Sequence, residues 1–252
     1  MENSIILNNI LFEMRHIFKN FGPVIALEDM SLFIQKGEVV ALLGDNGAGK
    51  STAVKIISGV YQPSSGEMFW EGSKVNFKSP EDARSIGIQT VYQDLALINT
   101  LSICRNFFLH EEPQTNYGFL KLLNLKKMRD DTKEILHNMG IKDLNPDSLV
   151  SALSGGERQA IAIGRAHYFG GKLLILDEPT AALSVKQTQK VFSIIEEVKS
   201  RGASVILIEH NMIHAHEIAD RIIIIRHGRV HGEFLKNDVS IVDLEEILAG
   251  YK

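Results

Sequence analysis

The sequence is poor in cysteine, with Cys104 as the single example among 252 residues. One thiol cannot form an internal disulfide framework, and it cannot supply the several thiolates of a Cys-rich zinc site. A low cysteine content also fits a reducing, cytoplasmic compartment. The sequence therefore gives no sign of a fold held together by crosslinks of either kind.

Long hydrophobic runs are also missing. Apolar runs such as Val205–Ile208 and Ile222–Ile225 are far shorter than the roughly 20 residues that cross a bilayer, and they predict buried strands instead. The first twenty residues, MENSIILNNILFEMRHIFKN, show no basic start followed by an apolar run and a small-residue cleavage site, so we expect no signal peptide. Work at a membrane would therefore require docking onto another protein.

An excess of positive charge is the third absence. The 27 basic and 31 acidic residues give a net charge of −4, which offers no electrostatic reason to expect nucleic acid as a partner. Hydrophobic residues make up 44% and charged residues 23%, as in ordinary globular proteins. A chain of this length can bury one α/β core, or divide into a large and a small lobe.

Strand and helix patterns alternate along most of the chain. Alternating hydrophobicity in 12–18 and 26–34, around a turn at Phe21-Gly22-Pro23, predicts antiparallel strands near the N-terminus. Short apolar runs then alternate with helical stretches. We expect strands at 39–43, 88–92, 172–176, 204–208 and 221–225, and helices at 51–58, 81–85, 157–166, 185–199, 211–218 and 242–248. This order predicts an α/β fold with a mostly parallel sheet covered on both faces.

The pattern changes between residues 94 and 151. Strand signals fade there, and 128–139 has helical apolar spacing at Met128, Thr132, Ile135 and Met139. We interpret 94–151 as an inserted α-helical subdomain. Residues 1–93 and 152–252 would then form the core together with the N-terminal antiparallel β subdomain.

A glycine-rich loop follows the strand predicted at 39–43. The sequence Gly44-Asp45-Asn46-Gly47-Ala48-Gly49-Lys50-Ser51 matches the P-loop pattern, and Thr52 follows it. Glycines let several backbone N–H groups converge on a polyphosphate, and the next helix presents its positive dipole end to the same anion. Lys50 is placed for the β- and γ-phosphates and the Ser51 hydroxyl for Mg²⁺. The loop predicts binding of a nucleoside triphosphate, most simply ATP.

Two carboxylates end the strand predicted at 172–176. Because parallel strands end at the sheet edge where ligands bind, Asp177 and Glu178 are expected beside the P-loop. Asp177 fits the role of holding hydrated Mg²⁺, and Glu178 is placed to polarise the attacking water. The alternative is a strand that simply ends in solvated acids.

A second glycine-containing turn precedes the helix predicted at 157–166. Ser154, Gly155 and Gly156 can bind an anion through backbone N–H groups at a helix start. Ser154 and Glu157 also match a capping box, and both interpretations can hold together. One P-loop and a second, distant anion-binding turn suggest that two copies face each other, each completing the other's site.

The combination of GDNGAGKST, LSGGERQ and LLILDEP resembles the nucleotide-binding subunit of ABC transporters, over nearly the whole chain. The resemblance implies further roles. Gln93 in VYQDL resembles the glutamine that contacts Mg²⁺ and water, His210 in VILIEHNM resembles the histidine that touches the γ-phosphate, and Phe21 resembles the aromatic residue that stacks on adenine. In this interpretation Glu178, His210 and Gln93 are catalytic, and Ser51, Gln93 and Asp177 hold the metal.

Two positions depart from the family pattern. The loop after DEP usually reads Ser-Ala-Leu-Asp, but here it is Ala181-Ala182-Leu183-Ser184, which affects how two subunits would communicate. Glu209 stands where serine or threonine more often precedes the histidine. Neither change removes a residue with a direct chemical role.

Longer stretches, including SPEDARSIGIQTVYQDLALINTLSICRNFFLHEE, resemble the ATPases of bacterial monosaccharide importers of the ribose, xylose and fructose type. Many of those carry two fused ATPase domains, whereas this sequence has one set of motifs. The resemblance therefore implies that the active form is a homodimer. It also implies integral membrane permease subunits, an extracytoplasmic sugar-binding protein and a place on the cytoplasmic face of the membrane. The alternatives are the ATPase of an exporter or of a soluble system that does not transport.

Overall fold

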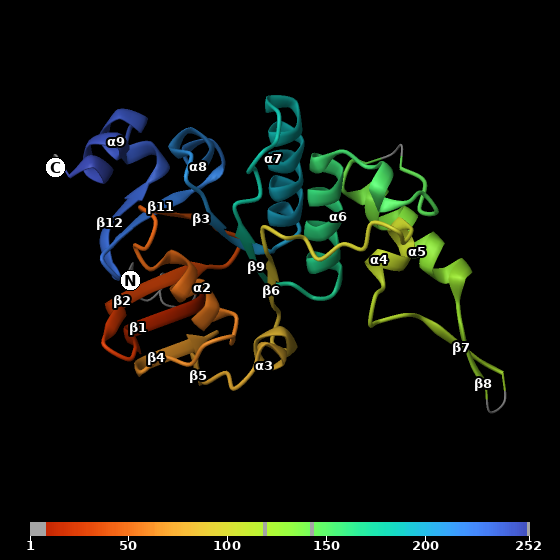
Figure 1. Cartoon of the computed structure of the whole chain (residues 1–252), viewed down its shortest axis with the longest axis horizontal. Coiled ribbons are helices and arrows are strands. Elements are labelled where there is room, and N and C mark those ends of the chain that lie inside the picture. Colours follow the sequence, from red (N-terminus) through yellow and green to blue (C-terminus); the bar gives the residue numbers. More distant parts are fainter. Residues whose placement is uncertain (1–8, 118–119, 142–143, 251–252) are drawn as a thin grey trace.

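The computed structural model describes residues 9–117, 120–141 and 144–250. Part of the segment on which the signal-peptide expectation rests, residues 1–8, lies outside them. The order of elements confirms an α/β fold with a mostly parallel sheet (Figure 1). None of the helices in the described ranges is long and apolar enough to span a membrane.

The six-stranded sheet forms the centre of the molecule, with the strand order β12-β11-β3-β10-β9-β6. Its neighbours are parallel except for β12, which pairs antiparallel with β11. The strands are β3 (Val39–Leu43), β6 (Ile88–Val91), β9 (Leu173–Asp177), β10 (Ser204–Ile208), β11 (Arg221–Arg226) and β12 (Arg229–Leu235). Every residue of β3 and β10 is buried, as a central strand covered on both faces requires.

Alternate residues of the central strands enter two separate cores. Val39, Ala41 and Leu43 pack on the side of the large helices, whereas Val40 and Leu42 pack toward the N-terminal sheet. This division follows from the two-residue period of a strand. The helices are α2 (Lys50–Ile57), α3 (Pro80–Ser85), α4 (Ile103–Phe107), α5 (Leu125–Asn138), α6 (Gly155–Tyr168), α7 (Val185–Ser200), α8 (Met212–Ile218) and α9 (Ile241–Ala249).

An antiparallel sheet of order β2-β1-β4-β5 covers the second core, as the N-terminal alternation predicted. It consists of β1 (Ile10–Phe21), β2 (Val24–Gln35), β4 (Ser65–Trp70) and β5 (Ser73–Val75). The sequence analysis did not identify β4 or β5. Trp70 lies on β4 itself and is buried against this core.

The segment 94–151 contains α5, as the helical spacing of 128–139 predicted, together with α4 and a two-stranded hairpin, which no specific sequence signal indicated. The hairpin pairs β7 (Gln114–Tyr117) with β8 (Leu120–Leu123) and extends from the end of the molecule that carries α4 and α5 (Figure 1). Every residue of β8 is exposed, so the half-buried alternation that marks a strand is absent. The helix α6 contacts both α5, in the predicted helical subdomain, and α7, in the predicted core. The boundary between these two parts at 151/152 therefore stays a prediction.

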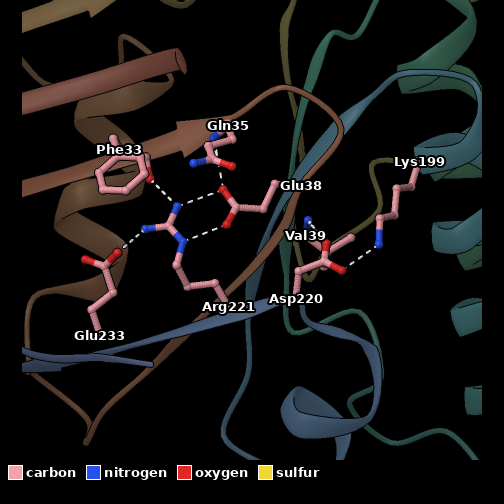
Figure 2. A network of polar contacts seen from close by, with 8 residues as sticks. All are labelled: Phe33, Gln35, Glu38, Val39, Lys199, Asp220, Arg221 and Glu233. Carbon is pink, nitrogen blue, oxygen red and sulfur yellow. Dashed lines mark hydrogen bonds and ion pairs between the residues drawn. The ribbon is translucent and has the colours of Figure 1, made fainter. Parts of the chain in front are cut away.

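A network of buried charge ties the two sheets together at the amino-terminal edge of the parallel sheet (Figure 2). Arg221 at the start of β11 donates to both carboxylate oxygens of Glu38, over 2.6 and 2.7 Å. It also donates to Glu233 of β12 and to the carbonyl oxygen of Phe33 in β2. Nearby, Asp220 accepts from the backbone N–H of Val39.

Candidate active site

The P-loop connects β3 to α2 at the carboxyl-terminal edge of the parallel sheet. Gly44 and Gly49 have φ of 150° and 111°. A Cβ on Gly44 would lie 2.2 Å from the carbonyl oxygen of Ile225, and one on Gly49 would lie 2.8 Å from Leu27 Cδ2. Only glycine fits a backbone that curls so closely against its neighbours. The loop is therefore shaped by its glycines for a ligand recognised through backbone N–H groups.

Lys50, the first residue of α2, lies folded over the loop. Its Nζ donates to the carbonyl oxygens of Gly44 at 2.6 Å and Asp45 at 3.0 Å. Burial lowers the pKa of Lys50, while the carboxylates of Glu178, Asp45 and Asp177 oppose that shift. The ammonium group is thus held where a polyphosphate in the loop would meet it.

The other predicted loop residues surround that position. Ala48 is buried and supports the loop, whereas Asn46, Gly47 and Ser51 are exposed and Thr52 is half-buried. Ser51 belongs to the first turn of α2, where backbone N–H groups have no partner within the helix. The sequence order thus places hydroxyl and N–H donors at one exposed helix start.

The two carboxylates end β9 as predicted, and their environments differ. Asp177 pairs with Ile208 of β10, and its pKa is raised by burial and by the adjacent charge of Glu178. Glu178 has φ of 48°, which a residue with a side chain seldom adopts. The backbone therefore leaves the strand conformation between the two carboxylates.

Glu178 lies between the other two residues that the sequence analysis assigned to catalysis. His210 Nε2 lies 2.8 Å from Glu178 Oε1. Gln93 Nε2 lies 3.5 Å from Glu178 Oε2, at the limit of a hydrogen bond. Gln93 follows β6, Glu178 follows β9 and His210 follows β10, so three neighbouring strand ends bring the three groups together.

Phe21 lies at the turn between β1 and β2 and is 42% exposed. Its ring meets that of Tyr61 edge to face at 5.2 Å, and Lys19 Nζ lies 5.0 Å from the Phe21 ring centre. Lys55 Nζ from α2 lies 5.5 Å from the Tyr61 ring. The sequence analysis missed Tyr61 because no motif contains it; only contact across the fold pairs it with Phe21.

The Ser154–Glu157 turn begins α6 as a capping box. The Glu157 carboxylate accepts from the Ser154 backbone N–H at 2.9 Å, and the Ser154 hydroxyl accepts from the N–H of Glu157. A Cβ on Gly155 would lie 2.8 Å from Leu183, and one on Gly156 would lie 3.1 Å from Gln187. The glycines therefore also let α6 begin close against the α7 side of the fold.

The structure does not bring this turn to the P-loop of the same chain. Figure 1 shows α2 and the α6–α7 pair in separate parts of the molecule. Within the described ranges, no hydrogen bond or ion pair joins Ser154–Glu157 to Gly44–Thr52; Glu157 instead pairs with Lys190 of α7. The two turns predicted to bind anions thus lie apart within one chain.

Both departures from the family pattern have structural partners. Ser184 is the N-cap of α7, in a capping box with Gln187. Glu209 is buried and accepts a hydrogen bond from Thr180, two residues after Glu178. The sequence showed that Glu209 was unusual, but it could not show that its side chain turns inward.

Curated relatives match nearly the whole chain. The xylose/arabinose import ATP-binding protein of Sulfolobus acidocaldarius is 47% identical over 241 residues, covering 96% of this chain and 94% of that protein. The fructose import ATP-binding protein of Rhizobium meliloti is 41% identical, with coverage of 94% and 93%. The ribose import ATP-binding protein of Caldanaerobacter subterraneus is 37% identical, and the match spans 95% of this chain but 48% of that one.

Solved structures share this fold, and a family model matches the sequence. A nucleotide-free ATP-binding cassette from an ABC transporter matches with a TM-score of 0.79 at 22% identity, over 95% of both chains. A dimeric cassette bound to ADP and phosphate matches with a TM-score of 0.72 at 25% identity, over 90% of this chain and 99% of that one. The model described as ABC transporter matches residues 27–181, more than half of the chain. The chain therefore belongs to the ABC transporter family of ATPases.

Proposed function

We propose that this protein is the ATP-hydrolysing subunit of a monosaccharide importer. Its support is the naming of the relatives at 47%, 41% and 37% identity, all of which are import ATP-binding proteins for pentoses or fructose. The observation that carries the catalytic half is the contact of Glu178 with His210 at 2.8 Å beside the P-loop. ATP hydrolysis would power the movement of sugar through a separate permease.

ATP would lie with its phosphates in the P-loop, from Gly44 to Thr52, and its adenine against Phe21. Lys50 would exchange its bonds to the loop carbonyl oxygens for the β- and γ-phosphates. The Phe21–Tyr61 pair offers an exposed aromatic surface with Lys19 and Lys55 beside it. Residues from β1 and α2 would thus form the two ends of one nucleotide site.

The donor set around Asp177 fits Mg²⁺. A half-buried carboxyl whose pKa is raised by burial and by Glu178 gains from a nearby cation, and Ser51 and Gln93 add hard oxygen donors. When bound, the ion neutralises charge on the β- and γ-phosphates. Asp177, Ser51 and Gln93 would hold it, directly or through water.

Glu178 acts as the general base in this proposal. Its carboxylate takes the proton of the attacking water as the water oxygen bonds to the γ-phosphorus and the bond to the ADP oxygen breaks. His210 contacts one oxygen of this carboxylate and Gln93 contacts the other, and together they would orient it. Both residues are also placed to detect whether a γ-phosphate is present.

Two copies of the chain would form the working ATPase. Within the described part of its own chain, the turn Ser154–Glu157 does not contact the P-loop. A second subunit would therefore supply the facing P-loop, so that two ATP molecules lie between the two subunits. The chain spans about half the length of its ribose-type relative. A homodimer would give two complete sites.

The permease would dock in a groove of about 740 Å³ between the parallel sheet and the helical insertion. Its walls come from α3, β6, the residues on either side of Gln93 (Tyr92 and 94–97), the segment 109–111 and α6. Arg165 of α6 lines the groove and donates to the carbonyl oxygen of Leu109 at 3.1 Å. A permease segment in this groove would contact the residues next to Gln93. That contact would hold the ATPase on the cytoplasmic face of the membrane, with an extracytoplasmic sugar-binding protein delivering the substrate.

The substitution Glu178→Gln tests this proposal, because it keeps size and removes the base. We expect turnover to fall by about a hundredfold or more while ATP affinity changes little. With ATP and Mg²⁺, the variant should sediment as a dimer. Full turnover, or a monomer at saturating ATP, would contradict the assignment of Glu178 or of the sandwich.

The transport half has its own readout in the same variant. A host strain that lacks this chain should lose uptake of at least one labelled pentose or hexose. The native chain should restore that uptake and Glu178→Gln should not. Unchanged uptake of all tested monosaccharides, together with normal ATP hydrolysis by the purified protein, would reject sugar import and keep the ATPase.

A further inference from the structure

Glu209 is a buried carboxylate that the proposed chemistry does not use. It is 4% exposed, at the carboxyl-terminal end of β10. No lysine or arginine of the described residues forms a salt bridge with it, and burial raises its pKa, opposed by bonds to Thr180 and by His214. A buried acid without a full ionic partner is costly and seldom kept for stability alone.

Its contacts form a short chain of hydrogen bonds. The Thr180 hydroxyl donates to Glu209 Oε1 at 2.7 Å. Thr180 Oγ1 also lies 2.9 Å from His214 Nδ1. Because the hydroxyl has one proton and gives it to the carboxylate, Nδ1 of His214 is the donor in the second bond. The order is therefore His214 to Thr180 to Glu209.

This series of hydrogen bonds lies next to the proposed catalytic pair, Glu178 and His210, in the sequence. Thr180 is two residues after Glu178, and Glu209 is the residue before His210. The backbone also links these segments, since the N–H of Glu178 donates to the carbonyl oxygen of Ile208 at 3.0 Å. Two side-chain contacts thus join the same two strand ends: Glu178 to His210 on the exposed side, and Thr180 to Glu209 on the buried side.

The segment 178–182, which these hydrogen bonds hold, has an unfavourable backbone conformation. Glu178 and Ala182 have φ of 48° and 59°, in the left-handed region that residues with a side chain rarely adopt. Thr180 lies between them and is 5% exposed. His214 in turn packs edge to face on Phe192 of α7, at 5.7 Å between ring centres. Thr180 is therefore held by Glu209, at the end of β10, and by His214, which packs on α7.

We infer that Thr180, Glu209 and His214 are positioning residues that hold His210 against Glu178. They act through the two strand ends and touch no substrate themselves. Through Thr180 they also connect the histidine end of β10 to the loop 181–184, which leads to α7. This inference rests on the proposed roles of Glu178 and His210 in ATP hydrolysis.

The test compares Thr180→Val with Thr180→Ser in the full chain. Valine keeps the shape and removes both hydrogen bonds, whereas serine keeps the hydroxyl. We expect the kcat for ATP to fall roughly tenfold in Thr180→Val, with KM within about twofold, and Thr180→Ser to stay within about twofold of the native kcat. A purely structural role would instead lower stability or raise KM without rescue by serine.

Three outcomes would overturn the inference: a native kcat in Thr180→Val, an equal loss in Thr180→Ser, or a loss in Thr180→Val explained by a matching rise in KM. If Thr180→Val does not fold, Glu209→Gln asks the same question, since it keeps an acceptor oxygen and loses the charge. It should lower kcat at least about threefold at unchanged KM, and a native kcat would again reject the proposal.

The native chain and Glu178→Gln are assayed alongside. Failure of the proposed function would appear as no ATP turnover in the native chain, or as full turnover in Glu178→Gln. Failure of the inference alone would leave both of those controls as expected, with Thr180→Val and Glu209→Gln keeping the native kcat.

Discussion

Two buried carboxylates lie at opposite edges of the same parallel sheet, and they are partnered very differently. Glu38, before β3, receives two bonds from Arg221 and one from the backbone N–H of Gln35 (Figure 2). Glu209, after β10, accepts a hydrogen bond from the Thr180 hydroxyl, where Glu38 has an arginine. One buried acid is fully paired and the other is not.

The difference follows the direction of the strands. In a parallel sheet the carboxyl-terminal ends meet where ligands bind, and the P-loop, Asp177 and His210 all lie there. The amino-terminal end carries no proposed site residue. There a bidentate arginine network satisfies every buried charge and joins β11 to β2, β3 and β12. We expect the Glu38 network to contribute to stability, and the Glu209 network to contribute to turnover at a cost in stability.

The largest expected effect comes from Arg221→Met, which removes the cation and leaves Glu38 buried without it. Burial lowers the pKa of Arg221, but its bonds to Glu38 outweigh that and raise it overall, so this cation is strongly held. Losing one member of a buried ion pair costs about 3–5 kcal/mol. Urea denaturation should show that loss, while kcat per folded molecule stays native. A large fall in kcat with native stability would reverse the comparison.

A smaller loss is expected from Asp220→Ala in the same region. Asp220 Oδ2 accepts from the backbone N–H of Val39, a fully buried residue, at 2.8 Å, and Oδ1 accepts from Lys199. Alanine leaves that N–H without an acceptor, which costs about 1–3 kcal/mol of unfolding free energy. Asp220→Asn is the matched control because it keeps an acceptor oxygen. Equal losses in both variants would show that the ion pair with Lys199 matters more than the backbone contact.

The fold and most of the site follow from local sequence, whereas the two networks do not. The P-loop, the strand end at Asp177 and the capping box at Ser154 each lie in one short segment, so spacing alone predicts them. Gln93, His210 and Phe21 instead follow from the resemblance to the family. Tyr61 beside Phe21 and Thr180 against Glu209 depend on which distant segments the fold brings together. The strand β8 was missed for a different reason: its residues are all exposed, so no alternation marks it.

The last prediction concerns the sign of a stability change. Burial raises the pKa of Glu209, with Thr180 and His214 opposing the shift, so folding makes ionisation of this acid harder than in the unfolded chain. Ionised Glu209 therefore costs stability at neutral pH, and this cost disappears as the pH falls through the raised pKa toward that of the unfolded chain. Glu209→Gln should unfold at slightly higher urea than the native chain at pH 8, and the difference should shrink toward pH 4.

Glu38→Gln is the control at the other edge of the sheet, and it should lower the urea midpoint at pH 8 because it breaks the pair with Arg221. Opposite signs in the two glutamine variants would mean that one buried acid stabilises the fold and the other is kept in spite of its cost. A lower urea midpoint in Glu209→Gln at pH 8 would place Glu209 with Glu38 among the stabilising residues. That result would remove the thermodynamic reason to assign it to positioning His210.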